Sequence, residues 1–169
     1  MRRIITAAVV AATGLFAVVG SGFADNRTIT DAEGDQVSGP PHHDFVSGTQ
    51  SHVGKRGLYH TATVAGKTDE TDFPRLQINT KGPRTSDNEY LALLTDAGPV
   101  VINEATGATK PLALSIGEDE QANTYRFAFR KGAIGKPKKK YGWRFIYETE
   151  GGVDDAMPND GYAIHRLEK

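Results

Sequence analysis

Short runs of alternating apolar and polar residues, separated by turn-forming residues, constrain the fold of this chain most strongly. No stretch keeps the helical period of about 3.6 residues. The clearest run is 124–130, in which Tyr125, Phe127 and Phe129 alternate with polar or small residues. A two-residue period is typical of a strand with one buried face. The pattern therefore predicts an all-β protein.

We expect about nine strands, because short alternating runs recur between turns rich in glycine, asparagine and aspartate. The expected strands cover residues 44–53, 58–64, 75–79, 90–95, 100–103, 111–116, 124–130, 141–150 and 162–167. Residues 25–43 and 151–161 are expected to be loops. Many short strands with short connections predict a two-sheet antiparallel β-sandwich that is jelly-roll-like.

The N-terminus has the three-part order of a secretory signal peptide. Basic residues 1–3 precede an apolar run at 4–19 and small residues at 20–24. The alternative is a retained membrane anchor, but the apolar run is shorter than the roughly 20 residues that span a bilayer. We therefore expect cleavage after residue 24. The product would be one secreted or envelope-associated domain of residues 25–169 with no membrane span.

Composition excludes several classes of function. The chain has 20 Lys and Arg against 21 Asp and Glu, so its net charge of −1 gives no reason to expect a nucleic-acid partner. It has no cysteine, which excludes disulfides and thiol nucleophiles. The nucleophile-elbow, zinc-protease and phosphate-loop motifs are missing from the sequence. These observations favour a protein that is not an enzyme. A small secreted hydrolase is the less favoured hypothesis. They do not indicate an oligomeric state.

Two carboxylate-rich loops offer candidate calcium ligands. One contains Asp31 and Asp35 on either side of a glycine turn, followed by Asp44, and the other covers residues 151–161. Calcium binds six to eight oxygen atoms of this kind. The terminal strands of a sandwich often meet, so the two loops are expected to share one ion. The alternative is that these residues only build exposed turns.

The order of motifs resembles a group of secreted β-sandwich domains. These are the xylanase-associated carbohydrate-binding modules, the C-terminal modules of glucodextranases and the DOMON-like domains. The motifs are Asp-x-x-Gly-Asp at 31–35, Asp-Phe at 44–45, Tyr-Arg-Phe-Ala-Phe at 125–129, Tyr-Gly-Trp-Arg-Phe at 141–145 and Asp-Asp-Ala-Met-Pro-Asn-Asp-Gly at 154–161. Phe45 departs from the aliphatic residue that relatives often have. The resemblance covers about residues 29–167 and implies a jelly-roll-like fold with a structural calcium in some members. When the calcium ligands of these domains are carried over to the matching positions, the resemblance implies Asp31, Asp35 and Asp155 as the ligands.

Aromatic side chains are the candidates for carbohydrate binding. Sugar rings stack on exposed aromatic faces while nearby polar groups bind their hydroxyls. The candidates are Trp143, Tyr147, Tyr90 and Tyr162, although Trp143 lies in an alternating strand and a core position is the favoured reading for it. The predicted function is a secreted, non-catalytic domain that binds a glycan or another cell-surface polymer. The alternative is an envelope-associated structural or protein-interaction domain.

Histidines provide a further candidate metal site. His42 and His43, with Asp44 and either His52 or His60, are residue types that bind zinc. Adjacent side chains diverge in an extended segment, however, so His42 and His43 are not expected to share an ion. His60 lies on the apolar face of its strand and is predicted to be a hydrogen-bonded core residue.

Overall fold

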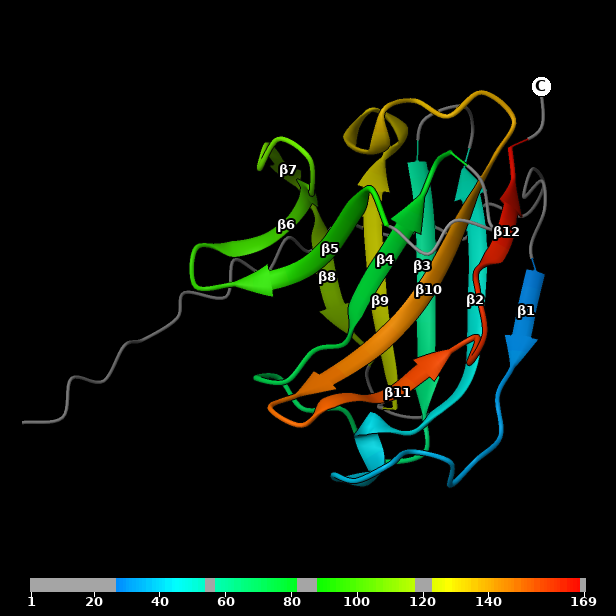
Figure 1. The fold of residues 1–169 in the computed structure, drawn as a ribbon, viewed down its shortest axis with the longest axis vertical. Helices are drawn as coiled ribbons and strands as arrows, with labels where there is room; N and C mark the ends of the chain where they lie inside the picture. Colours follow the sequence, from blue (N-terminus) through cyan, green and yellow to red (C-terminus); the bar gives the residue numbers. More distant parts are fainter. Residues whose placement is uncertain (1–26, 54–56, 82–87, 118–122, 168–169) are drawn as a thin grey trace, which may run out of the picture.

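The computed structural model of the protein describes residues 27–53, 57–81, 88–117 and 123–167, which form two antiparallel β-sheets packed face to face (Figure 1). The first sheet has five strands in the order β1-β2-β3-β9-β8. The second has seven, in the order β11-β10-β4-β5-β6-β7, with β12 also paired to β10. The strands are β1 (Arg27–Thr30), β2 (Phe45–Val53), β3 (Gly57–Val64), β4 (Arg75–Asn79), β5 (Tyr90–Thr95), β6 (Gly98–Asn103), β7 (Thr109–Pro111), β8 (Ala113–Ile116), β9 (Thr124–Arg130), β10 (Lys140–Thr149), β11 (Gly152–Met157) and β12 (Ala163–Arg166). The predicted all-β sandwich of two antiparallel sheets is confirmed.

Both sheets direct apolar side chains into one core. In the first sheet, Tyr125, Phe127 and Phe129 on β9 are buried, as their alternation predicts. In the second sheet, Trp143 and Phe145 on β10 are fully buried, and the ring centroids of Phe127 and Phe145 lie 5.3 Å apart across the interface. Burial of one such side chain contributes roughly 1.5–3 kcal/mol. Packing between the sheets therefore fixes the positions of the strand ends.

Among the described residues there are twelve strands, where the sequence predicts about nine. Strands β1 and β11 lie in the segments 25–43 and 151–161, so the prediction that these segments are loops throughout is wrong. A further strand arises because 111–116 divides at Leu112 into β7 and β8, which belong to different sheets. Pairing at a sheet edge satisfies backbone N–H and C=O groups whatever the side chains are. Alternation in the sequence therefore does not reveal such strands.

The helices in the described part of the chain are two 3₁₀ turns, η1 (Pro41–His43) and η3 (Lys131–Ile134). Proline at the start of η1 has a fixed φ that suits the first position of a helix. No helix in these parts of the chain has the length and apolarity needed to cross a membrane. The predicted signal peptide, residues 1–24, lies outside the described residues.

Four buried polar rings form a hydrogen-bonded chain across the core. His52 Nδ1 lies 3.0 Å from His165 Nε2, and His165 Nδ1 lies 2.7 Å from the Tyr141 hydroxyl. That hydroxyl lies 2.7 Å from His60 Nε2. The predicted core position of His60 is confirmed, although its Nδ1 has no partner. Burial, reinforced by His165, lowers the pKa of His60 well below its usual value, so this ring is neutral at neutral pH.

Candidate functional site

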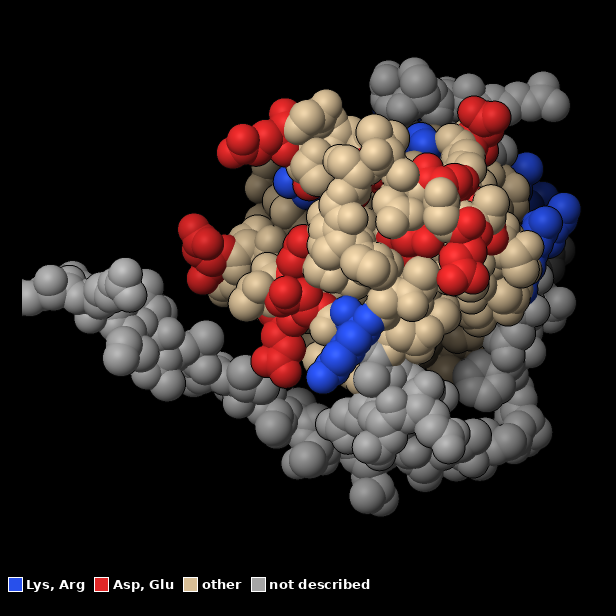
Figure 2. Space-filling model, turned by 90° about the horizontal axis from the view of Figure 1, so that it is seen from below, with Lys and Arg blue, Asp and Glu red and all other residues tan. Residues whose placement is uncertain are grey.

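Two groups of metal-ligand types meet at the end of the sandwich that carries η1. The loop at residues 31–44 runs along this end and contacts β11, which follows the turn after β10 (Figure 1). Acidic side chains gather on this end of the molecule, beside few basic ones (Figure 2). One group consists of aspartates, and the other combines two histidines with an aspartate.

The aspartate group unites the first loop with β11. Asp35, Asp44 and Asp155 each place one carboxylate oxygen so that all three oxygens lie within 4.8 Å of one another. Backbone N–H groups position the two buried members. Gly34 N donates to Asp44 Oδ2 at 2.7 Å, and Phe45 N donates to Asp155 Oδ2 at 2.6 Å. These bonds hold the carboxylates side by side although they come from opposite ends of the chain.

The electrostatics of this group favour a cation. Burial, with repulsion from Asp31 and Asp35, raises the pKa of Asp155 to about 6. Burial, with repulsion from Asp35 and Asp44, also raises the pKa of Asp31. Asp44 is 2 % exposed, and its Oδ1 atom has no hydrogen-bond partner; Asp31 Oδ2 is likewise buried and unpartnered. Burying a carboxylate oxygen without a partner costs free energy.

Protein groups compensate the cluster only in part. Asn159 donates from Nδ2 to Asp35 Oδ2 at 2.9 Å. The charge of Arg144 lowers the pKa of Asp31 against the larger effect of burial, but its guanidinium donates to the Asn159 carbonyl. Among the described residues, Arg144 forms no ion pair with these carboxylates.

Of the three predicted calcium ligands, the structure brings Asp35 and Asp155 into this group. Asp31 lies outside the group, but it is close enough to repel Asp155 and to be repelled by Asp35 and Asp44. Asp44, which follows the first carboxylate pair in the sequence, is not among the predicted ligands but belongs to this group. The sequence feature that could have indicated Asp44 as a ligand is its position directly before Phe45, the aromatic residue that begins β2. A buried strand start holds an adjacent carboxylate in place, whereas an exposed turn does not.

The second group has His42 and His43 directed at Asp72. His43 Nε2 lies 2.7 Å, and His42 Nε2 3.3 Å, from the same atom, Asp72 Oδ2. The expectation that adjacent histidines diverge is wrong here, because they lie in the 3₁₀ turn η1 and not in an extended segment. Asp44, His52 and His60, the other zinc ligand types considered from the sequence, are not part of this group.

A buried carboxylate on β11 orients His43. Asp154 Oδ2 lies 2.8 Å from His43 Nδ1, and Asp154 Oδ1 accepts from Ser38 N at 2.6 Å and from Ser38 Oγ at 3.0 Å. Burial would raise the pKa of Asp154, but hydrogen bonds from His43 and Ser38 hold it below its usual value. Asp154 lies in an irregularity of the β10–β11 pairing, between the partners of Tyr147 and Glu148. Such bulges redirect side chains, which explains why Asp154 faces inward.

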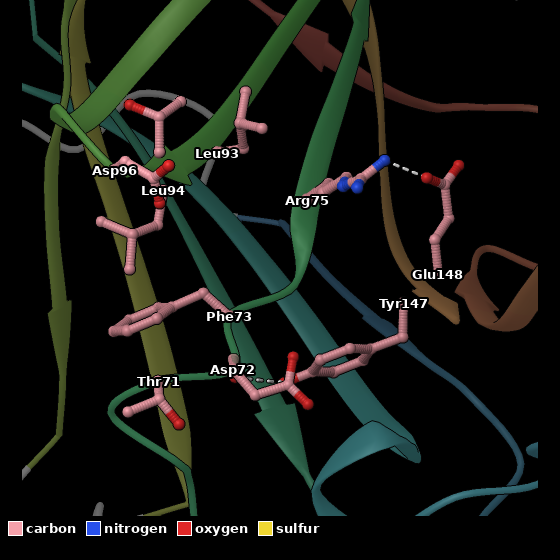
Figure 3. A pocket seen from close by; sticks show the side chains of 10 residues that line it. Thr71, Asp72, Phe73, Arg75, Leu93, Leu94, Asp96, Tyr147 and Glu148 are labelled. Carbon is pink, nitrogen blue, oxygen red and sulfur yellow. Dashed lines mark hydrogen bonds and ion pairs between the residues drawn. The ribbon is translucent and has the colours of Figure 1, made fainter. Parts of the chain in front are cut away.

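A cavity of about 290 Å³ lies beside the histidine group (Figure 3). It is lined where β4 begins and where β5 and β10 end. The lining comprises Thr71, Asp72, Phe73, Arg75, Leu93, Leu94, Thr95, Asp96, Tyr147 and Glu148. Arg75 forms an ion pair with Glu148 on one side, and Phe73 and the leucines supply apolar surface on another. Asp72 belongs to both the cavity and the histidine group.

The predicted carbohydrate-binding rings are not gathered at one surface. Trp143 is 0 % and Tyr147 2 % exposed, so the prediction of an exposed stacking face is wrong for both rings, although Tyr147 is among the residues that line the cavity. The indole N–H of Trp143 donates to the Gln50 side-chain oxygen, and the Tyr147 ring stacks on His43. Tyr90 and Tyr162 are partly exposed, but they lie near the opposite ends of β5 and β10 from the cavity. Alternation correctly placed the buried pair in the core.

Comparison with known proteins gives no relative: no family model, no curated protein and no solved structure matches the chain. The functional argument therefore depends on the geometry of the site.

Proposed function

We propose that the protein is a secreted, non-catalytic binding domain whose terminal segments are joined by a bound calcium ion. The ligands proposed are Asp31, Asp35, Asp44 and Asp155. The observation that carries this proposal is the buried, unpartnered Oδ1 atom of Asp44, next to two other carboxylates. Calcium would supply a positive charge and accept oxygen ligands in irregular arrangements.

Calcium suits this cluster better than a transition metal does. All its side-chain donors are oxygen atoms, and the loop around Gly34 can add backbone carbonyls. Imidazole and thiolate ligands, which favour zinc or copper, are not among them. The ion would relieve the repulsion that raises the pKa of Asp155 and Asp31. Its role is then to fix the loop at 31–44 against β11.

Calcium is expected to raise the melting temperature, and Asp44→Asn is expected to remove this response. At a calcium concentration about 100 times Kd, the ion adds about 2.7 kcal/mol of stability. For a domain of this size, that corresponds to a rise of roughly 5–10 °C. Differential scanning fluorimetry in calcium and in chelator measures the difference for each variant.

Asp160→Asn is the matched control for the calcium experiment. Asp160 is an exposed carboxylate in the adjacent loop and lies outside the cluster. This variant should keep the full response to calcium. Equal melting temperatures of the unmodified protein in calcium and in chelator would remove the ion from the proposal.

For the bound ligand we propose a neutral sugar residue of a surface glycan, held in the cavity beside β4, β5 and β10. A volume of about 290 Å³ is at the lower limit for small-molecule sites, and it fits one ring better than a long oligosaccharide. The carboxylates of Asp96 and Glu148 and the guanidinium of Arg75 would bind hydroxyls. Phe73 and Leu94 would contact the apolar face of the ring.

Glycan binding is expected to depend on the cavity and not on the exposed tyrosines. Asp96→Asn and Glu148→Gln should each weaken binding about 10-fold, because each replaces a charged hydrogen-bond acceptor. A polysaccharide array followed by calorimetry on the best ligand measures this, with Tyr162→Ala as the control. Binding lost only in Tyr162→Ala would move the site away from the cavity. The protein-interaction alternative would be favoured by two results together. The array would show no bound glycan, and an envelope protein would be captured even in the presence of free sugar.

A further inference from the structure

We propose that His42, His43 and Asp72 form a binding site for a divalent transition-metal ion, with zinc as the preferred ion. The site is separate from the calcium cluster. Both imidazole Nε2 atoms face one carboxylate oxygen, Asp72 Oδ2, at 2.7 and 3.3 Å. Two neutral imidazoles and one carboxylate are a ligand set that suits zinc and not calcium.

The contact with Asp154 determines which nitrogen of His43 is free. Asp154 accepts two hydrogen bonds from Ser38, and its other oxygen faces His43 Nδ1 at 2.8 Å. A neutral ring has one proton for two carboxylates, so one ring nitrogen presents a lone pair to an acceptor. With the proton on Nδ1, that nitrogen is Nε2, and a cation between Nε2 and Asp72 Oδ2 would relieve the repulsion. Zinc-bound histidines commonly donate their other nitrogen to a carboxylate in this manner.

The spacing of the ligand atoms is compatible with zinc. Zinc binds nitrogen and oxygen at about 2.0–2.2 Å, so tetrahedral ligand atoms lie about 3.3 Å apart. The distance from His42 Nε2 to Asp72 Oδ2 is 3.3 Å. His43 and Asp72 are closer and would separate slightly when the ion enters. Three protein ligands leave one position for water.

The surrounding residues hold the rings in place and leave a path for the ion. The His43 ring stacks on Tyr147 with centroids 4.3 Å apart, and His42 lies edge-on to His43. A Cβ atom at Gly39 would lie 2.7 Å from His43 Nδ1, so only glycine fits this approach. The Asp72 side chain is 47 % exposed, whereas that of His43 is 8 % exposed. An ion can therefore reach the site from the side of Asp72.

The test is a titration with Co²⁺, which substitutes for zinc and has visible absorption that reports its coordination. The full chain, without a histidine tag, is treated with chelator and then kept in excess Ca²⁺ so that the aspartate cluster does not bind the probe. We expect one Co²⁺ per chain, with the strong absorption of a four-coordinate ion. Zn²⁺ should displace it.

Variants assign the ligands. His42→Ala and Asp72→Asn leave the bond between His43 and Asp154 intact, and each should weaken Co²⁺ binding about 100-fold or more. Asp154→Asn should weaken it about 10- to 100-fold, as expected for loss of an orienting carboxylate. Asp160→Asn removes an exposed carboxylate that belongs to neither group, so this variant should bind Co²⁺ as the unmodified protein does. Circular dichroism verifies that each variant is folded.

The proposal is overturned if the unmodified protein binds no Co²⁺ at saturation. It is also overturned if the absorption is that of a six-coordinate ion, or if both His42→Ala and Asp72→Asn retain full binding. Asp44→Asn separates the two metal proposals. This variant should lose the response to calcium and keep the cobalt spectrum.

Discussion

Asp154→Ala is expected to lower the free energy of unfolding by about 3–5 kcal/mol. The Asp154 side chain is fully buried and accepts hydrogen bonds from Ser38 N and Ser38 Oγ, with a third contact to His43 Nδ1. Alanine would remove the acceptor of all three groups, and the ring of His43 is itself buried. The change would also remove the side-chain bonds between Ser38 and β11, and leave the backbone bond from Val37 N to the Asp154 carbonyl.

Urea unfolding in the presence of chelator measures this loss without a contribution from metal. Ser38→Ala is the matched control, since it removes one hydroxyl hydrogen bond and keeps the backbone bond from the same residue. Its expected cost is about 1 kcal/mol. Equal losses in the two variants would contradict the central role of Asp154.

Tyr141→Phe is expected to cost about 2–5 kcal/mol, although it removes a single oxygen atom. That oxygen lies 2.7 Å from His60 Nε2 and 2.7 Å from His165 Nδ1, and all three side chains are buried. Phenylalanine would leave both nitrogens without this partner, and each buried unsatisfied group costs about 1–3 kcal/mol. The Tyr141 hydroxyl stabilises the fold because it forms hydrogen bonds with two histidines at once, His60 on β3 of one sheet and His165 on β12 of the other.

Tyr147→Phe makes the same chemical change at an equally buried ring. The Tyr147 hydroxyl lies 3.4 Å from the Asp72 carbonyl, a long contact, and forms a hydrogen bond with the Tyr125 side chain. The Tyr125 hydroxyl keeps its bonds with Asp69 N and the Asp72 carbonyl in the variant, so we expect a cost of about 1 kcal/mol. Thermal or urea unfolding of the two variants side by side is the measurement. A larger loss for Tyr147→Phe would show that the histidine chain is not the more important network.

The sequence predicted a strand correctly wherever one face of the strand is buried, because burial of one face makes apolar and polar residues alternate. Tyr125, Phe127 and Phe129 alternate because one face of β9 meets the core, and the same is true of Trp143 and Phe145 on β10. Strands β1 and β11 could not be found in this way. Their pairing depends on backbone groups at the sheet edge, and β11 contains an irregularity that breaks alternation at Asp154.

The candidate site was only partly predictable for a related reason. Both loops are rich in carboxylates, and two of the residues that the resemblance implies, Asp35 and Asp155, lie together in the structure. Asp72 could not be assigned, because its approach to His42 and His43 depends on the packing of a distant loop. The 3₁₀ turn that makes the two histidines converge has no periodic signal in three residues.

The two proposed ion sites are built from the same two pairs of adjacent residues. His43 and Asp154 belong to one site, while their chain neighbours Asp44 and Asp155 belong to the other. An ion bound in either site would fix the peptide units that join His43 to Asp44 and Asp154 to Asp155. These same peptide units position residues of the other site. The affinities are then thermodynamically coupled: calcium must change the affinity for zinc by the same factor as zinc changes that for calcium. A domain built in this way would respond to the joint availability of two metals and not to each one alone.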